Sequence, residues 1–190
     1  MGNYSYITEW KTAIERTERF DLKLPECRLQ SEKRYLTPQF IQEFPYILQK
    51  ELGVIEKNEV ISQCLIFHLR ILPILHKHLE CGAYFTIGWI DILHTDFLFK
   101  FDDLFIEKSI KNKGFNKNIN IHAWITLDSM EIIDATLSTT IAMAQKNENG
   151  YGGIIMQHDD TSKGLFYMPM LVGDDFLVKS GAMKFISIIY

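Results

Sequence analysis

The feature that most constrains the fold is an alternating segment that turns back on itself. In residues 119–127, INIHAWITL, every odd-numbered side chain is apolar, and these side chains share one face of an extended chain. The opposite face carries His122, Trp124 and Thr126. Residues 128–129, Asp-Ser, have turn chemistry, and residues 131–136, EIIDAT, suit a returning strand. The pattern predicts a β-hairpin.

His122 and Asp134 are the polar pair of this predicted hairpin. With the turn at residues 128–129, the two residues are expected to lie roughly level on neighbouring strands. Cross-strand neighbours have Cβ atoms about 4.5–5.5 Å apart, so an imidazole and a carboxylate there can form a hydrogen bond. A histidine oriented by a carboxylate is the arrangement of a general base, and it predicts a nucleophile elsewhere in the chain.

Helical patterns come before strand patterns along the chain. Apolar spacing predicts helices at residues 10–20, 38–51 and 63–79, the third bent or interrupted at Pro73. Beyond Gly82, alternation predicts strands at residues 83–93, 119–127, 131–137, 151–158, 165–172 and 183–190, with short helices at 102–111 and 138–146. This order predicts an α+β fold in which N-terminal helices pack on a mostly antiparallel sheet.

The length of 190 residues suits a single domain. We expect a helical N-terminal part at residues 1–60, a core at 61–137 and an extension of the sheet at 138–190. The net charge of −4 and the lack of a long basic block argue against nucleic acid or an anionic membrane as a partner. No apolar run is long enough to span a bilayer and no secretory signal is visible, so a cytoplasmic location is the default expectation. A secreted effector without a cleavable signal would have the same features, and the sequence does not indicate an oligomeric state.

The candidate nucleophile is one of three cysteines, an odd number that favours a reduced, intracellular type of protein. If Ser62 caps the third helix, Cys64 lies in its first turn, where the positive end of the helix dipole favours a thiolate. If Asn58 is the cap instead, Cys64 lies in the second turn and the effect is weaker. The alternative interpretation is that Cys64 is a small apolar residue of the core.

The order of these motifs along the chain resembles that of a known enzyme family. A helix that begins at Cys64 leads to a strand containing Gly88-Trp89, then to the HAW of residues 122–124 and the IDAT of residues 133–136. This order, over residues 62–136, resembles the transglutaminase-like superfamily of papain-fold cysteine enzymes. The resemblance implies a papain/transglutaminase-like core.

The resemblance also implies a catalytic triad. In it, Cys64 is the nucleophile, His122 the base and Asp134 the group that orients the base. The backbone N–H of Cys64 would bind the oxyanion, helped by a side-chain amide such as Gln63 or Asn58. Trp124 shares the face of His122 and is expected near the substrate groove, although it could equally be a core aromatic.

The expected reaction is acyl transfer from an amide bond of a protein or peptide substrate. Resolution of the thioester by water gives a peptidase, amidase or deamidase, and resolution by an amine gives a transglutaminase. No cofactor is implied. His76, His78 and His94 do not complete a set of metal ligands, so we predict no metal site. One alternative is a catalytically inactive binding module of the same fold, in which the same residues are structural. Another is a toxin or effector domain that uses the triad.

Two segments are candidates for the walls of a substrate groove. The connection at residues 91–118 is long and rich in phenylalanine, which is typical of a lid or of an additional core helix. Residues 151–153 and 168–170 are candidates for the other wall, on strands that extend the sheet carrying His122 and Asp134. The alternative is that residues 167–170 belong to the core and that the glycines at 152–153 form a bulge.

Overall fold

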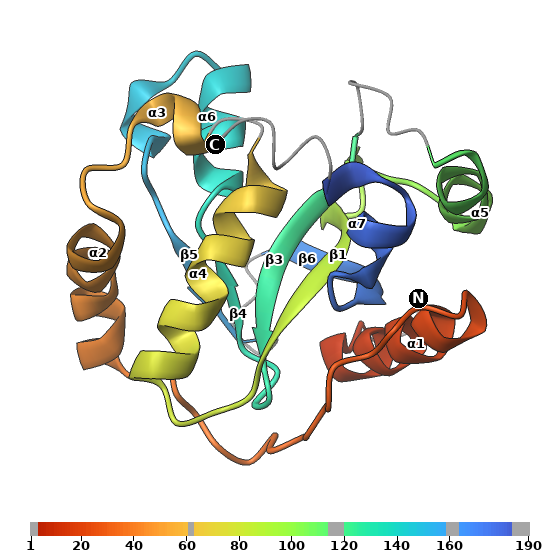
Figure 1. Cartoon of the computed structure of the whole chain (residues 1–190). Helices are drawn as coiled ribbons and strands as arrows, with labels where there is room; N and C mark the ends of the chain where they lie inside the picture. Colours follow the sequence, from red (N-terminus) through yellow and green to blue (C-terminus); the bar gives the residue numbers. More distant parts are fainter. Residues whose placement is uncertain (1–3, 61–62, 114–119, 159–163, 184–190) are drawn as a thin grey trace. The chain divides into compact units, whose positions relative to one another are not determined.

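The computed structural model describes residues 4–60, 63–113, 120–158 and 164–183 (Figure 1). The chain has an α+β fold with antiparallel strand pairing. Its contacts divide it into two compact units, which are described separately. Unit 1 comprises Met1–Glu26, Thr86–His122 and Lys163–Tyr190, and unit 2 comprises Cys27–Phe85 and Ala123–Ser162. Among the described residues, no helix combines the length and the apolar character that crossing a bilayer requires.

In unit 1, helix α1 (Tyr6–Arg19) packs against strand β6 (Leu165–Val172) (Figure 1). The buried face of α1 has helical spacing and carries Tyr6, Trp10, Ala13 and Thr17. The Thr17 hydroxyl accepts a hydrogen bond from the Val172 N–H at 2.9 Å, and the Tyr4 hydroxyl donates one to the Tyr167 carbonyl at 2.7 Å. These bonds hold the two ends of the helix against the strand.

Strand β1 (Ala83–Ile92) connects the pieces of unit 1, although its first three residues belong to unit 2. It pairs antiparallel with β2 (Asp96–Leu98) and with β6, and the β6 register shifts between Ile87 and Gly88. Helices α5 (Asp103–Asn112) and α7 (Asp175–Lys179) complete the unit. The Arg16 guanidinium binds the Asp103 carboxylate at 2.9 Å and so links α1 to α5.

In unit 2, helices α2 (Pro38–Leu52) and α3 (Lys57–Val60) both contact α4 (Cys64–His78) (Figure 1). The Arg70 guanidinium binds the Glu59 carboxylate at 2.7 Å, which ties α3 to α4. We expected a bend or an interruption at Pro73; helix α4 continues through it, so the interruption is wrong. Its buried side chains lie on both sides of the proline, and this packing holds the helix together despite the missing backbone donor.

The predicted hairpin is confirmed in unit 2, but its register differs from the expectation. Strand β3 (His122–Leu127) pairs with β4 (Ile132–Asp134) through Ile125 opposite Ile133 and Thr126 opposite Ile132. Continued by one pair, this register sets Trp124 level with Asp134, so the expectation that His122 would be level with it is wrong. A two-residue loop at 128–129 would already set Ala123, not His122, level with Asp134. The loop has three residues, 128–130, and ends at Met130 with a φ of 67°, which moves the register one residue further, to Trp124.

Strand β5 (Ile155–Gln157) pairs with β4, including Asp134 opposite Ile155, so this part of the predicted sheet extension is confirmed. The other predicted part, β6, pairs with β1 of the same sheet, which has six strands within the described residues, so it extends the sheet as well. Helix α6 (Leu137–Ala144) and a short 3-10 turn, η1 (Glu148–Gly150), lie between β4 and β5 in sequence. Most of the strand predicted at residues 183–190 lies outside the described residues.

The hairpin loop is also an anchor for the N-terminal connection of unit 2. The buried Glu131 carboxylate accepts hydrogen bonds from the Tyr35 N–H at 2.7 Å and the Leu36 N–H at 3.2 Å. The buried Asp128 carboxylate accepts one from the Gly82 N–H at 2.9 Å and one from the Gln30 amide at 3.2 Å. Buried carboxylates are tolerated when they are bound by donors. Three of these four donors come from the loop that leads into α2, and the Gly82 N–H comes from the connection between α4 and β1.

Candidate functional site

Cys64 is the first residue of α4 and is half-buried. The prediction that it lies in the first helical turn is therefore confirmed. Gln63 is the N-cap residue and makes no side-chain capping bond, while its N–H donates to the Val60 carbonyl at 3.2 Å. Asn58 belongs to the separate helix α3, so it is not the cap of α4, and Ser62 lies outside the described residues. The start of a helix presents backbone N–H groups and a partial positive charge to a sulfur at this position.

The other two cysteines have environments that suppress the thiolate. Burial raises the pKa of the Cys27 thiol to about 11. Burial, followed by the negative charges of Asp128 and Glu131, raises the pKa of the Cys81 thiol to about 12. All three cysteines are free thiols. At neutral pH Cys27 and Cys81 are therefore poor nucleophiles, which leaves Cys64 as the cysteine whose position suits the predicted chemistry.

His68 links the start of α4 to the end of β4. Its side chain is fully buried, with Nδ1 2.8 Å from the Cys64 carbonyl oxygen. The Ala135 N–H donates to Nε2 at 3.1 Å, and Nε2 lies 3.6 Å from Asp134 Oδ1. A carbonyl can only accept and an amide N–H can only donate, so the ring is neutral with its proton on Nδ1. The imidazole thus connects the backbone of Cys64 to the residue that follows Asp134.

Asp134 is fully buried and fixes the start of α6. Its Oδ1 accepts hydrogen bonds from the Thr136 N–H at 2.9 Å, the Thr136 hydroxyl at 3.2 Å and the Leu137 N–H at 3.0 Å. These donors include backbone groups that the first turn of a helix cannot pair internally. The carboxylate therefore has a structural role of its own, which the sequence pattern did not reveal.

Trp124 and His122 lie on the same face of β3, two residues apart. Trp124 belongs to unit 2, is fully buried and is level with Asp134 in the hairpin register. His122 belongs to unit 1, where its ring stacks on Phe99 with centroids 4.9 Å apart and planes inclined by 16°. Phe99 is part of the phenylalanine-rich connection, so one aromatic residue of that segment covers the predicted base.

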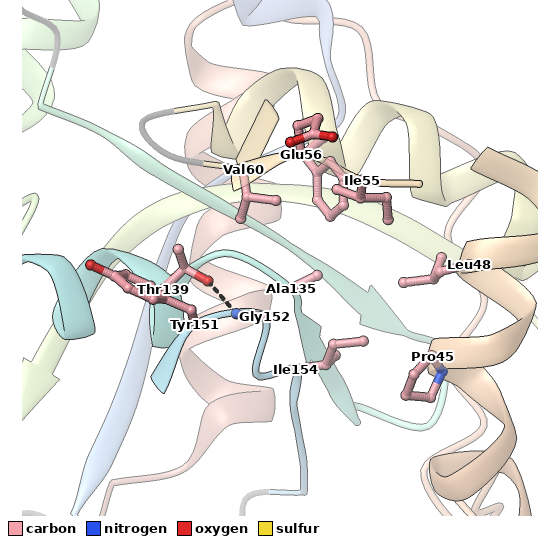
Figure 2. A pocket seen from close by; sticks show the side chains of 11 residues that line it. Pro45, Leu48, Ile55, Glu56, Val60, Ala135, Thr139, Tyr151, Gly152 and Ile154 are labelled. Carbon is pink, nitrogen blue, oxygen red and sulfur yellow. Dashed lines mark hydrogen bonds between the residues drawn. The ribbon is translucent and has the colours of Figure 1, made fainter. Parts of the chain in front are cut away.

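A pocket of about 230 Å³ lies in unit 2 (Figure 2). Its buried floor consists of Leu48, Val60, Phe67, Ala135 and Thr139. Its more exposed rim consists of Pro45, Ile55, Glu56, Tyr151, Gly152 and Ile154. The Thr139 hydroxyl accepts a hydrogen bond from the Gly152 N–H at 3.0 Å, which fixes one edge. Sequence reasoning proposed Tyr151 and Gly152 for a groove wall but missed the floor, because its residues come from separate helices and a linker.

The histidines considered as metal ligands have other partners. His76 Nε2 lies 3.1 Å from the Ala83 carbonyl oxygen, and His78 Nε2 lies 3.2 Å from a Glu51 carboxylate oxygen. His94 Nδ1 lies 2.8 Å from an Asp91 carboxylate oxygen in unit 1. Within the described ranges, no cluster of three or more histidine, cysteine or acidic side chains is arranged to hold a metal ion.

Comparison with known proteins adds no relative: the chain matches no protein-family model, no curated protein and no solved structure. The transglutaminase-like resemblance therefore rests on the sequence motifs alone.

Proposed function

We propose that the chain is a cysteine-dependent acyl-transfer enzyme that acts on amide bonds of a protein or peptide. Cys64 Sγ attacks the amide carbonyl carbon, the C–N bond breaks, and the amine leaves with a proton from the general acid. Water or a second amine then attacks the thioester and regenerates the thiol. The roles of His122 as base and Asp134 as its orienting group stay predictions from the sequence.

The observation that supports this proposal most is the position of Cys64. It is half-buried at the first residue of a 15-residue helix, and its carbonyl is bound to the buried imidazole of His68. This position supports the proposal because the backbone N–H groups at the start of a helix can bind a thiolate and a developing oxyanion. The raised pKa values of the Cys27 and Cys81 thiols argue against either of them as the nucleophile.

An inactive binding module is a second candidate, and one observation favours it. His68 and Asp134 already have structural roles, the first as a bridge between α4 and β4 and the second as the cap of α6. Their presence is then explained without catalysis. On this reading the pocket would bind a ligand without Cys64 taking part.

Acylation of the native protein separates the two candidates. The protein is incubated at neutral pH with p-nitrophenyl acetate, and the acetylated cysteine is located by mass spectrometry. The enzyme should gain one acetyl group on Cys64 and release it during turnover. Cys64→Ser should abolish both, and a Cys27→Ser/Cys81→Ser variant should react like the wild type.

Loss of the general base should slow acylation without removing the thiol. His122→Gln should therefore acylate Cys64 more slowly while keeping a folded structure by circular dichroism. If Cys64 is no more reactive than Cys27 and Cys81 in the native protein, the chain is not a cysteine acyl-transfer enzyme. If acylation is unchanged in His122→Gln, His122 is not the base.

A further inference from the structure

The pocket of unit 2 is built from residues that neighbour the two predicted catalytic residues of that unit. Phe67 lies one turn after Cys64 on α4, and residues three apart on a helix share a face. Ala135 directly follows Asp134 and donates its N–H to His68. Two floor residues of the pocket therefore lie within three residues of Cys64 and Asp134 along the chain.

The lining of the pocket selects for an apolar group. Glu56 is the single charged residue among the lining residues, and it lies on the exposed rim. The hydroxyl oxygen of Thr139 already accepts a hydrogen bond from the Gly152 N–H. A Cβ placed on Gly152 would meet no atom within 4 Å, so this side of the rim is open. The pocket is therefore an apolar floor that is reached from solvent (Figure 2).

The size of the pocket limits what can enter it. A volume of about 230 Å³ is the space of roughly seven or eight water molecules, taking about 30 Å³ for each. Pockets that enclose a whole drug-sized ligand or cofactor are typically about 300–1,000 Å³. The volume matches one leucine, methionine or phenylalanine side chain and is too small for a large cofactor.

We infer that this pocket binds one bulky apolar side chain of the amide substrate, and that it sets the substrate class of the enzyme. This inference rests on the proposed function, since it takes the ligand to be the acyl donor of Cys64. Substrates would carry a leucine- or phenylalanine-sized residue near the reacting carbonyl. Small polar residues at that position would leave the apolar floor exposed to water and would bind more weakly.

Methyl NMR on a Cys64→Ser protein tests the inference without catalysis. Ile55 and Ile154 report on the rim, and Ile106, which is buried in unit 1, is the reference. N-acetyl-leucine amide and N-acetyl-phenylalanine amide should shift both rim methyls in a saturable way, and N-acetyl-serine amide should not. Hexanamide tests a bare acyl chain. If it binds better than the amino-acid amides, the assignment to a peptide side chain is overturned.

A pocket-filling variant supplies the second measurement. Ile154→Trp should weaken binding of the leucine and phenylalanine amides at least about tenfold, which corresponds to about 1.4 kcal/mol. The matched control is Ile41→Trp, the same change at an exposed isoleucine of α2 that does not line the pocket, and it should bind normally. Equal binding of the serine amide, or unchanged binding in Ile154→Trp, would overturn the inference.

The proposed function and the inference fail in different ways. If Cys64 of the wild type is acylated but the rim methyls do not respond to apolar amides, the pocket assignment is wrong and the enzyme proposal stands. If apolar amides bind but Cys64 is never acylated, the enzyme proposal is wrong, and with it the assignment of the ligand as an acyl donor.

Discussion

Replacing His68 by leucine should be one of the most damaging single changes in unit 2. The imidazole is fully buried and is bonded to the Cys64 carbonyl and the Ala135 N–H. Leucine is similar in size but has no polar atom. The substitution therefore removes both hydrogen bonds and leaves two buried backbone groups without this partner.

The cost can be estimated from the two bonds. Leaving the buried Ala135 N–H without an acceptor costs about 1–3 kcal/mol, and losing the bond to the Cys64 carbonyl costs about 0.5–1.5 kcal/mol. The additional apolar surface of leucine offsets about 1 kcal/mol of this. We expect His68→Leu to lower the free energy of unfolding by about 0.5–3.5 kcal/mol.

Glutamine at position 68 is the matched comparison. Its amide can reach the position of Nε2 and offer an oxygen to the Ala135 N–H, so His68→Gln should lose less than half as much stability. Urea unfolding of wild type and both variants measures the difference, provided that the dependence on denaturant is unchanged. Acylation of Cys64 should slow more in the leucine variant, because the start of α4 is held less firmly.

The nitrogen chemical shifts of His68 give a test that needs no variant. The bonding pattern requires a protonated Nδ1 and an unprotonated Nε2 at neutral pH. An imidazolium, or a ring protonated on Nε2, would refute the bridge between Cys64 and Ala135. So would a stability loss below about 0.5 kcal/mol in His68→Leu, which is the size expected of a surface substitution.

Three further outcomes are expected. Cys27 and Cys81 should resist iodoacetamide at pH 8 in the native protein and react after denaturation, because burial holds their thiol pKa values near 11 and 12; counting thiols in both states checks this. Asp134→Ala should cost about 1–2 kcal/mol of unfolding free energy through the lost cap of α6, and Asp134→Asn clearly less because an acceptor oxygen remains; urea unfolding would contradict this if both variants lost the same amount. The hydrogen bond from Arg70 lowers the pKa of Glu59, so this pair stabilises the fold above the ordinary glutamate pKa and the contribution disappears as pH falls through the lowered value. Arg70→Gln should thus cost at most about 1 kcal/mol at neutral pH and nothing in strong acid, and a cost that persists in acid would show that the loss is one of packing.

Much of the secondary structure could be predicted from the sequence because its signals are local. Helical spacing located α1, α2 and α4, and alternation located β1, β3, β4 and β6, each to within a few residues. The sequence leaves the helix start at Cys64 open between two caps, Ser62 and Asn58, because the residue that precedes the helix, Gln63, makes no side-chain capping bond. Short elements such as α3, β2 and α7 were missed, since three to five residues are too few to establish a period.

The candidate site was predictable only in part. Its residue types and their order along the chain are properties of the sequence, and they are enough to select Cys64, His122 and Asp134 as candidates. The register of the hairpin could not be predicted from the sequence. It depends on a three-residue loop in which Met130 adopts a positive φ, and no glycine or asparagine marks that position. A single added loop residue changes which side chain is opposite Asp134.

The sequence by itself therefore determined the elements, the α+β class and the candidate chemistry, because each depends on residues close together in the chain. The tertiary structure alone decided that His68 bridges Cys64 and Ala135 and that Glu131 can be buried. It also decided that a pocket forms in unit 2, with Ala135 in its floor. These features need partners from segments far apart in sequence. A buried polar group is tolerated only where such partners are brought within hydrogen-bonding distance, and no local pattern records where the fold will bring them.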